Sequence, residues 1–78
     1  MRVWLWSAGN WHGVTDNEDR AKLAAQVRLR DGDTASVELA IAALGFRELS
    51  AMYIRTGTGW TARAAAGSVT WSPQIPHP

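Results

Sequence analysis

The sequence predicts a small, single α+β domain in which one amphipathic helix packs on a mostly antiparallel sheet. Three observations lead to this prediction. Residues 16–30 are rich in helix formers, residues 2–6 are aromatic and β-branched, and residues 50–72 contain short β-rich runs separated by glycines. A chain of 78 residues has room for one domain. We expect that domain to span residues 1–72, with residues 73–78 as a proline-rich extended tail.

The N-terminal segment is predicted to form the first strand. Residues 2–6 are Arg-Val-Trp-Leu-Trp, and β-branched and aromatic side chains are typical of strands. Residues 7–13 contain two glycines and an asparagine, which predicts a loop. This loop carries His12, which we expect to be a solvated side chain.

The helix prediction for residues 16–30 depends on both of its ends. Thr15, followed three residues later by Glu18, matches a capping box, in which the threonine hydroxyl binds an N-terminal amide and the glutamate reaches back. Asp31-Gly32 provides a stop signal after the last turn. The sequence also predicts a thin apolar stripe on this helix, formed by Leu23, Ala24 and Val27.

The segment 34–44 fits two periodicities. Alternation of Val37, Leu39, Ile41 and Ala43 is strand spacing, whereas Val37, Ile41 and Leu44 also fall at helical spacing. The alanine content favours a helix and the β-rich neighbouring sequence favours a strand. We favour the strand, which Gly45 would end.

Residues 50–72 are predicted to form a β-meander with strands at 51–56, 60–63 and 68–72 and turns at 57–59 and 64–67. Alternation assigns Met52, Ile54, Val69 and Trp71 to a core face that packs on the helix through Leu23 and Val27. The opposite face then carries Tyr53, Arg55, Thr61, Arg63, Ser68, Thr70 and Ser72. That face is either a phosphate-contacting surface or the ordinary solvated side of an antiparallel sheet.

Composition excludes several classes of function. The chain has no cysteine, no G-x-S-x-G elbow, no phosphate-binding Walker loop and no dinucleotide fingerprint. Five of the seven acidic residues group at the helix start and around a turn, where capping and turn chemistry explain them, and we expect the isolated Glu38 and Glu48 to be solvated. His12 and His77 lie at opposite ends of the sequence, so a metal site is not expected. We therefore predict a protein that is not an enzyme and that has no cofactor.

No targeting or membrane segment is expected either. The apolar run at residues 3–6 is too short for a signal peptide or a membrane span. Together with the lack of cysteine, this predicts a cytoplasmic protein.

The sequence carries two resemblances. Tyr53–Arg63, the run Gly67–Trp71 and the opening Trp4-Leu5-Trp6 resemble small uncharacterised proteins of actinobacterial type, which implies a bacterial source but no activity. Gly59-Trp60-Thr61-Ala62-Arg63, followed by a glycine turn and another strand, is similar to the three-stranded DNA-reading modules at the N-termini of phage-type integrases. In those modules the helix follows the strands, whereas here it precedes them.

Two functional hypotheses follow. The first is a small nucleic-acid-associated accessory protein, in which Arg55 and Arg63 contact phosphates while Tyr53 or Trp60 stacks on a base. The second is a protein–protein interaction module or homodimer. Its anchor would be an exposed tryptophan, the candidates being Trp4, Trp6 and Trp11. Each of the five tryptophans also has a purely structural interpretation as part of the core.

Overall fold

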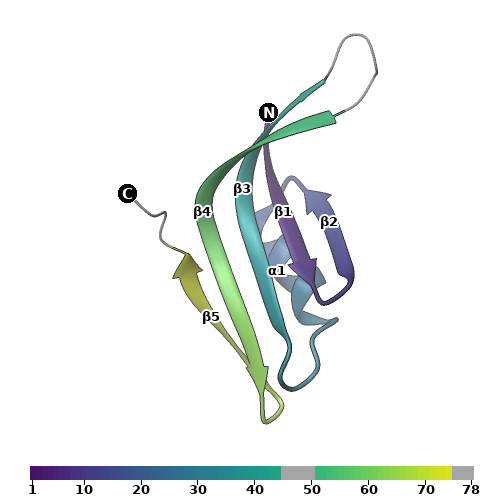
Figure 1. The fold of residues 1–78 in the computed structure, drawn as a ribbon, viewed down its shortest axis with the longest axis vertical. Helices are drawn as coiled ribbons and strands as arrows, with labels where there is room; N and C mark the ends of the chain where they lie inside the picture. The colour runs from purple at the N-terminus through teal and green to yellow at the C-terminus, as the bar shows by residue number, and fades with distance from the viewer. Residues whose placement is uncertain (45–50, 75–78) are drawn as a thin grey trace.

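The computed structural model describes residues 1–44 and 51–74 and confirms the α+β prediction. One helix covers one face of a five-stranded antiparallel sheet with strand order β2-β1-β3-β4-β5 (Figure 1). The elements are β1 (Arg2–Ala8), β2 (Trp11–Thr15), α1 (Glu18–Gln26), β3 (Thr34–Leu44), β4 (Ala51–Ala65) and β5 (Ser68–Gln74). The helix contacts β1, β2 and β3, and no helix of the described residues lies on the opposite face of the sheet.

The core between the helix and the sheet is built from alanines. One register row crosses all five strands and consists of Trp11, Ala8, Ala35, Ala62 and Trp71. Its three alanines are buried together with Ala25 of α1, so the helix approaches the sheet closely at the centre of this row. The bulky tryptophans stand at the two ends of the row. Close packing here therefore comes from small side chains in the middle and large ones at the margins.

All five tryptophans lie on the face that carries the helix. Trp6 pairs with Val37, and Val37 pairs with Trp60, so these residues form a second row across the sheet. This row lies two residues from the alanine row along each strand, and it therefore projects from the same face. Trp4 follows by the same alternation along β1. Trp6 and Trp71 pack against the buried alanines, so the structural interpretation applies to these two tryptophans.

The expected apolar contacts of the helix are wrong. Leu23 and Val27 are 62% and 66% exposed, and Ile54 of β4 is 63% exposed. Because the sheet presents alanines, the helix turns its own alanines, Ala21 and Ala25, toward them and leaves its larger side chains in solvent. Val69 and Trp71 do pack against the core as predicted. The side chain of Met52 lies outside the described part of the chain.

The helix is also shorter than the predicted segment 16–30. Its N-cap is Asn17, whose Oδ1 accepts a hydrogen bond from the Arg20 amide at 3.0 Å, and not Thr15. Asparagine is at least as good a cap as threonine, and Thr15 is already paired in β2. The last turn closes at Val27, and the Arg28 guanidinium donates to the Ala24 carbonyl at 2.9 Å.

Two segments predicted as turns are strand. Residues 7–13 hold only a tight turn at Gly9-Asn10, so Ser7 belongs to β1 and His12 to β2. Residues 57–59 lie inside the continuous strand β4. Between the pairs Glu38–Gly59 and Ala40–Arg55, β3 advances two residues and β4 advances four, which makes a bulge.

The segment 34–44 is a strand, as favoured, and the consecutive strands β3, β4 and β5 form the C-terminal meander. The turn between β4 and β5 uses Ala66 and Gly67, both with positive φ. β5 runs through Pro73 to Gln74, two residues beyond the expected domain boundary. Pro73 is accommodated because β5 is an edge strand, where one side of the backbone forms no ladder.

Candidate ligand-binding face of the sheet

The face of the sheet opposite α1, called the open face below, carries a row of hydroxyl groups. Ser7 pairs with Ser36, Ser36 with Thr61, and Thr61 with Ser72, so one row crosses β1, β3, β4 and β5. Neighbouring strands are about 4.8 Å apart, so this hydroxyl row extends over roughly 14 Å. Ser7 Oγ and Ser36 Oγ share a hydrogen bond of 2.8 Å, which fixes one end of the row.

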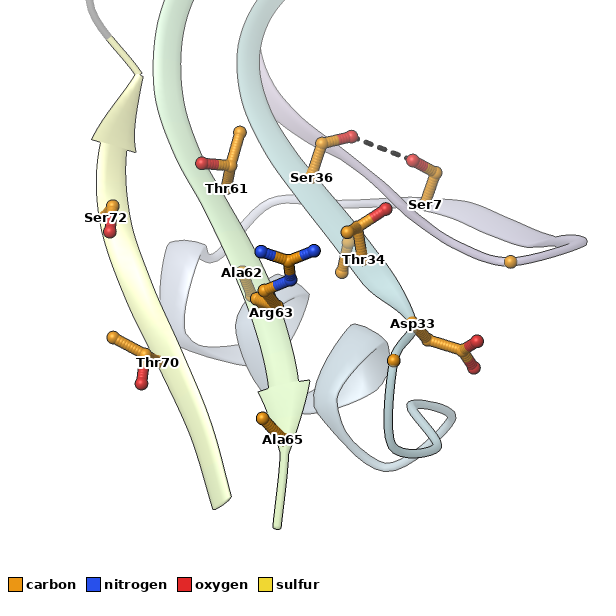
Figure 2. Close-up of a pocket in the computed structure, with 13 residues that line it drawn as sticks. Ser7, Asp33, Thr34, Ser36, Thr61, Ala62, Arg63, Ala65, Thr70 and Ser72 are labelled. Carbon is orange, nitrogen blue, oxygen red and sulfur yellow. Dashed lines mark hydrogen bonds between the residues drawn. The ribbon is translucent and has the colours of Figure 1, made fainter. Parts of the chain in front are cut away.

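Arg63 lies in the adjacent row, between Thr34 of β3 and Thr70 of β5. Figure 2 shows its guanidinium near the middle of a hollow whose rim includes the hydroxyl row. This hollow is shallow and open, with a volume of about 970 Å³. Asp33 lines its edge, and its carboxylate is directed away from the guanidinium (Figure 2).

Arg63 has no anionic partner in the part of the chain that the structure describes. The ion pairs of residues 1–44 and 51–74 join Lys22 to Glu18 and Arg55 to Glu38, and neither includes Arg63. An exposed guanidinium surrounded by hydroxyl groups offers donors to an oxyanion from several directions. This corner of the open face is therefore suited to a phosphate or a carboxylate.

A second charged group on the open face is compensated within the protein. The expectation that Glu38 is solvated is wrong, because this residue of β3 is only 5% exposed. Its two oxygens accept from Arg55 Nε at 3.1 Å and Nη2 at 2.7 Å. The Gly57 amide, at the bulge, also donates to Oε2 at 3.3 Å. These bonds to Arg55 lower the pKa of Glu38 despite its burial, and the same contact raises the pKa of Arg55.

Next to this ion pair is a smaller hollow with mostly apolar walls. Its volume is about 320 Å³, and Leu5, Val14 and Tyr53 line it together with Arg55. Tyr53 and Arg55 are two residues apart on β4, so both side chains project from the same face. Ser7 and Ser36 line both hollows, so the two hollows adjoin each other on the open face.

The residues predicted for nucleic-acid binding divide between the two faces. Tyr53, Arg55 and Arg63 lie on the open face, as alternation predicted. Trp60 lies on the helix side, where its Nε1 donates to Glu18 Oε1 at 2.5 Å and Lys22 Nζ sits 3.7 Å from the ring centroid. Since Trp60 adjoins Thr61 in the strand, the period of two already assigns the two residues to opposite faces.

The tryptophans predicted as interface anchors differ in exposure. Trp4 and Trp6 are half-buried on the helix side, whereas Trp11 is 60% exposed on the edge strand β2. The Arg28 guanidinium lies about equally far from the ring centroids of Trp6 and Trp11, at 5.1 and 4.9 Å. Trp11 is thus the one member of this predicted set with a largely free ring.

Several open-face residues were missed by the sequence reasoning. Ser7 falls in a segment predicted as a loop, and Ser36 and Glu38 fall in the segment with two periodicities. The available signal was the spacing of Thr34, Ser36 and Glu38, which alternate with apolar residues in the first half of that segment. His12 likewise projects from β2 beside Ser7 and not from a loop.

The described residues contain neither a cluster of metal-ligating side chains nor a helix that could cross a membrane. No group of three or more His, Cys, Asp or Glu side chains that would hold a metal ion occurs in residues 1–44 and 51–74. The nine-residue helix of that part of the chain is too short to cross a membrane. No protein-family model, curated protein or solved structure matches the chain, so the resemblances drawn from its motifs stay predictions.

Proposed function

We propose that this chain is a non-enzymatic binding module that holds a single-stranded nucleic acid on its open sheet face. The observation that supports this most is the Arg63 guanidinium, which has no anionic partner among the described residues and is bordered by the hydroxyl row. Arginine and hydroxyl side chains are common donors to phosphate oxygens. The acidic groups of this face either point away, as Asp33 does, or are neutralised, as Glu38 is.

The shape of the face favours a single strand over a duplex. Five strands at about 4.8 Å spacing make a surface roughly 19 Å wide, whereas the major groove of DNA admits an element about 12 Å across. A single strand can lie along such a surface, with its phosphates at Arg63 and its bases on an exposed aromatic ring. Tyr53, which is 41% exposed on the same face, supplies that ring.

A cytoplasmic location is part of this proposal. The chain has no cysteine and builds its core and its open face without disulfides, which suits a reducing compartment where nucleic acids are present.

Fluorescence anisotropy of labelled single-stranded DNA, RNA and duplex DNA, titrated at low and at physiological salt, tests the proposal. We expect the single strands to bind more tightly than the duplex and to weaken with added salt. Arg63→Gln should reduce the slope of log K against log salt by about 0.7, the value for one phosphate contact on a single strand. Arg20→Gln, on the helix side, is the matched control and should leave the slope unchanged. No binding at low salt, or equal slopes for the two variants, would exclude this function.

A protein partner is a second candidate, and Trp11 is the observation that favours it. Trp11 lines a hollow together with Val27 and Leu29 and with the charged residues Arg28 and Arg30, and both Trp11 and Val27 are mostly exposed. Large exposed aromatic side chains beside aliphatic ones are typical of interface anchors. Sedimentation velocity of the wild type and of Trp11→Ala tests whether the anchor joins two copies of the chain. A homodimer that is insensitive to salt and is lost in Trp11→Ala would support this candidate, whereas a monomer at all concentrations would exclude the dimer.

A further inference from the structure

The Arg55 guanidinium is held in a fixed orientation, and part of it still faces solvent. Glu38 engages Nε and Nη2, the two donors on one edge of the group. Arginine has five N–H donors, so the outer edge, formed by Nη1 and the second hydrogen of Nη2, remains available. The Arg55 side chain is 67% exposed although Glu38 is buried. The buried carboxylate therefore positions a two-pronged donor at the surface.

The surroundings of this donor suit a flat ring better than a phosphate. The adjoining hollow of about 320 Å³ is at the small end of the range for ligand pockets, roughly 300–1,000 Å³, and its walls include Leu5, Val14 and the ring of Tyr53. Apolar walls with a few directed polar groups are the usual setting for a planar heterocycle. Phosphate, by contrast, gains little from contact with aliphatic side chains.

The charge of the ion pair also favours a neutral ring over a phosphate. The positive charge of Arg55 is offset by Glu38 at a hydrogen-bonding distance of 2.7 Å, so this pair is nearly neutral as seen by a ligand. A ligand with two adjacent neutral acceptors can accept hydrogen bonds from the outer edge of the Arg55 guanidinium, and it does not need a free positive charge there. Among the bases, guanine offers such a pair in O6 and N7, which arginine binds more often than any other base edge.

We propose that the hollow beside Arg55 receives a guanine base, and that the outer edge of the Arg55 guanidinium reads its O6 and N7. This inference rests on the proposed binding of a single strand to the open face. It adds sequence preference to that function, with Arg63 on the backbone and Arg55 on one base. Glu38 is a positioning residue, because it acts on the base only through the orientation of Arg55.

Base substitution within one oligonucleotide tests the inference with the unaltered protein. A thymine-rich strand with one central guanine is compared by anisotropy with strands that carry adenine, cytosine, hypoxanthine or 7-deazaguanine at that position. Guanine and hypoxanthine, which both keep O6 and N7, should bind alike and roughly 5- to 150-fold more tightly than adenine or cytosine. 7-Deazaguanine lacks the N7 acceptor and should lose most of this advantage.

Two variants test whether the preference for guanine comes from the Arg55 guanidinium. Arg55→Lys keeps the charge but has no fork, so the preference for guanine should disappear while binding to the thymine-rich strand persists. Arg63→Gln is the matched control, in which all strands should weaken by a similar factor and the preference should remain. Equal binding of all the strands to the wild type would overturn the inference and leave the proposed function standing. Binding of 7-deazaguanine as tightly as guanine would overturn the O6 and N7 contact, and no binding of any strand would overturn both proposals.

Discussion

The ion pair between Glu38 and Arg55 leads to an asymmetric prediction, because its two members are so differently exposed. Arg55→Gln leaves a carboxylate that is 5% exposed with the Gly57 amide as its remaining donor among the described residues. Glu38→Gln leaves a guanidinium that is 67% exposed and that water can solvate. The first change should therefore destabilise the protein more than the second.

The magnitudes follow from the cost of an unpaired buried charge. Removing one partner of a fully buried pair costs about 3–5 kcal/mol, and the exposure of Arg55 lowers this to about 2–3 kcal/mol for Arg55→Gln. For Glu38→Gln we expect about 1 kcal/mol, the net value of one hydrogen bond, because water can solvate the guanidinium that loses its partner. In a domain of this size the difference corresponds to a gap in Tm on the order of 10 °C. Urea denaturation followed by tryptophan emission measures both free energies of unfolding.

Acid should reduce the loss of stability caused by Arg55→Gln. The pKa of Glu38 is lowered in the folded wild type, so its contribution to stability is complete above the unfolded value and is lost as the pH falls through the folded one. In Arg55→Gln, burial without the guanidinium should raise that pKa, so protonation then favours the folded state. The stability gap between wild type and Arg55→Gln should therefore narrow from neutral pH to about pH 4. Equal losses for the two variants, or a gap that does not change with pH, would refute this reasoning.

Three further predictions concern the packing, and the second of them includes a control variant. Gly59→Ala should abolish folding or cost more than about 3 kcal/mol, because its Cβ would lie 1.9 Å from a backbone carbonyl oxygen of β3; circular dichroism detects the loss. Ala25→Leu should lower the free energy of unfolding by about 1–3 kcal/mol, because the larger side chain would push the helix away from the alanine row. Leu23→Ala is the control at an exposed position and should change the free energy of unfolding by no more than about 0.5 kcal/mol. Urea denaturation measures both values. Lys22→Met removes the cation above Trp60 and should cost about 0.5–1 kcal/mol with a change in tryptophan emission; unaltered emission would contradict the stacked geometry.

The strands could be predicted from the sequence where polar and apolar side chains alternate. The helix could be predicted because a capping signal precedes it. Residues 34–44 form a strand because their alternation continues through the polar positions Thr34, Ser36 and Glu38. The glycines at 57 and 59 misled the prediction because glycine serves a turn and a bulge equally well. Their role depends on the partner strand, since Gly59 is required by its contact with the backbone of Val37.

The burial of the helix could not be predicted, because large apolar side chains are normally taken as the buried ones. Here the sheet carries alanines under the helix, so the helix can pack closely only with its own small residues, Ala21 and Ala25, against the sheet. Leu23 is left in solvent. The open face was half predictable. Alternation placed Tyr53, Arg55 and Arg63 together, but the pairing of Arg55 with Glu38 joins residues 17 apart in sequence through a bulge that no local pattern shows.

The division of aromatic residues between the two faces gives the molecule two separate optical probes. All five tryptophans lie on the helix side, with Lys22 or Arg28 over the rings of Trp60, Trp6 and Trp11. The single tyrosine of the chain, Tyr53, lies on the other side. Tryptophan emission therefore reports on the seating of the helix and not directly on a ligand. If a ligand quenches tyrosine emission and leaves tryptophan emission unchanged, the sheet keeps its shape when the ligand binds. If both emissions change, binding on the open face also moves residues on the helix side, which is separated from the ligand only by the sheet backbone.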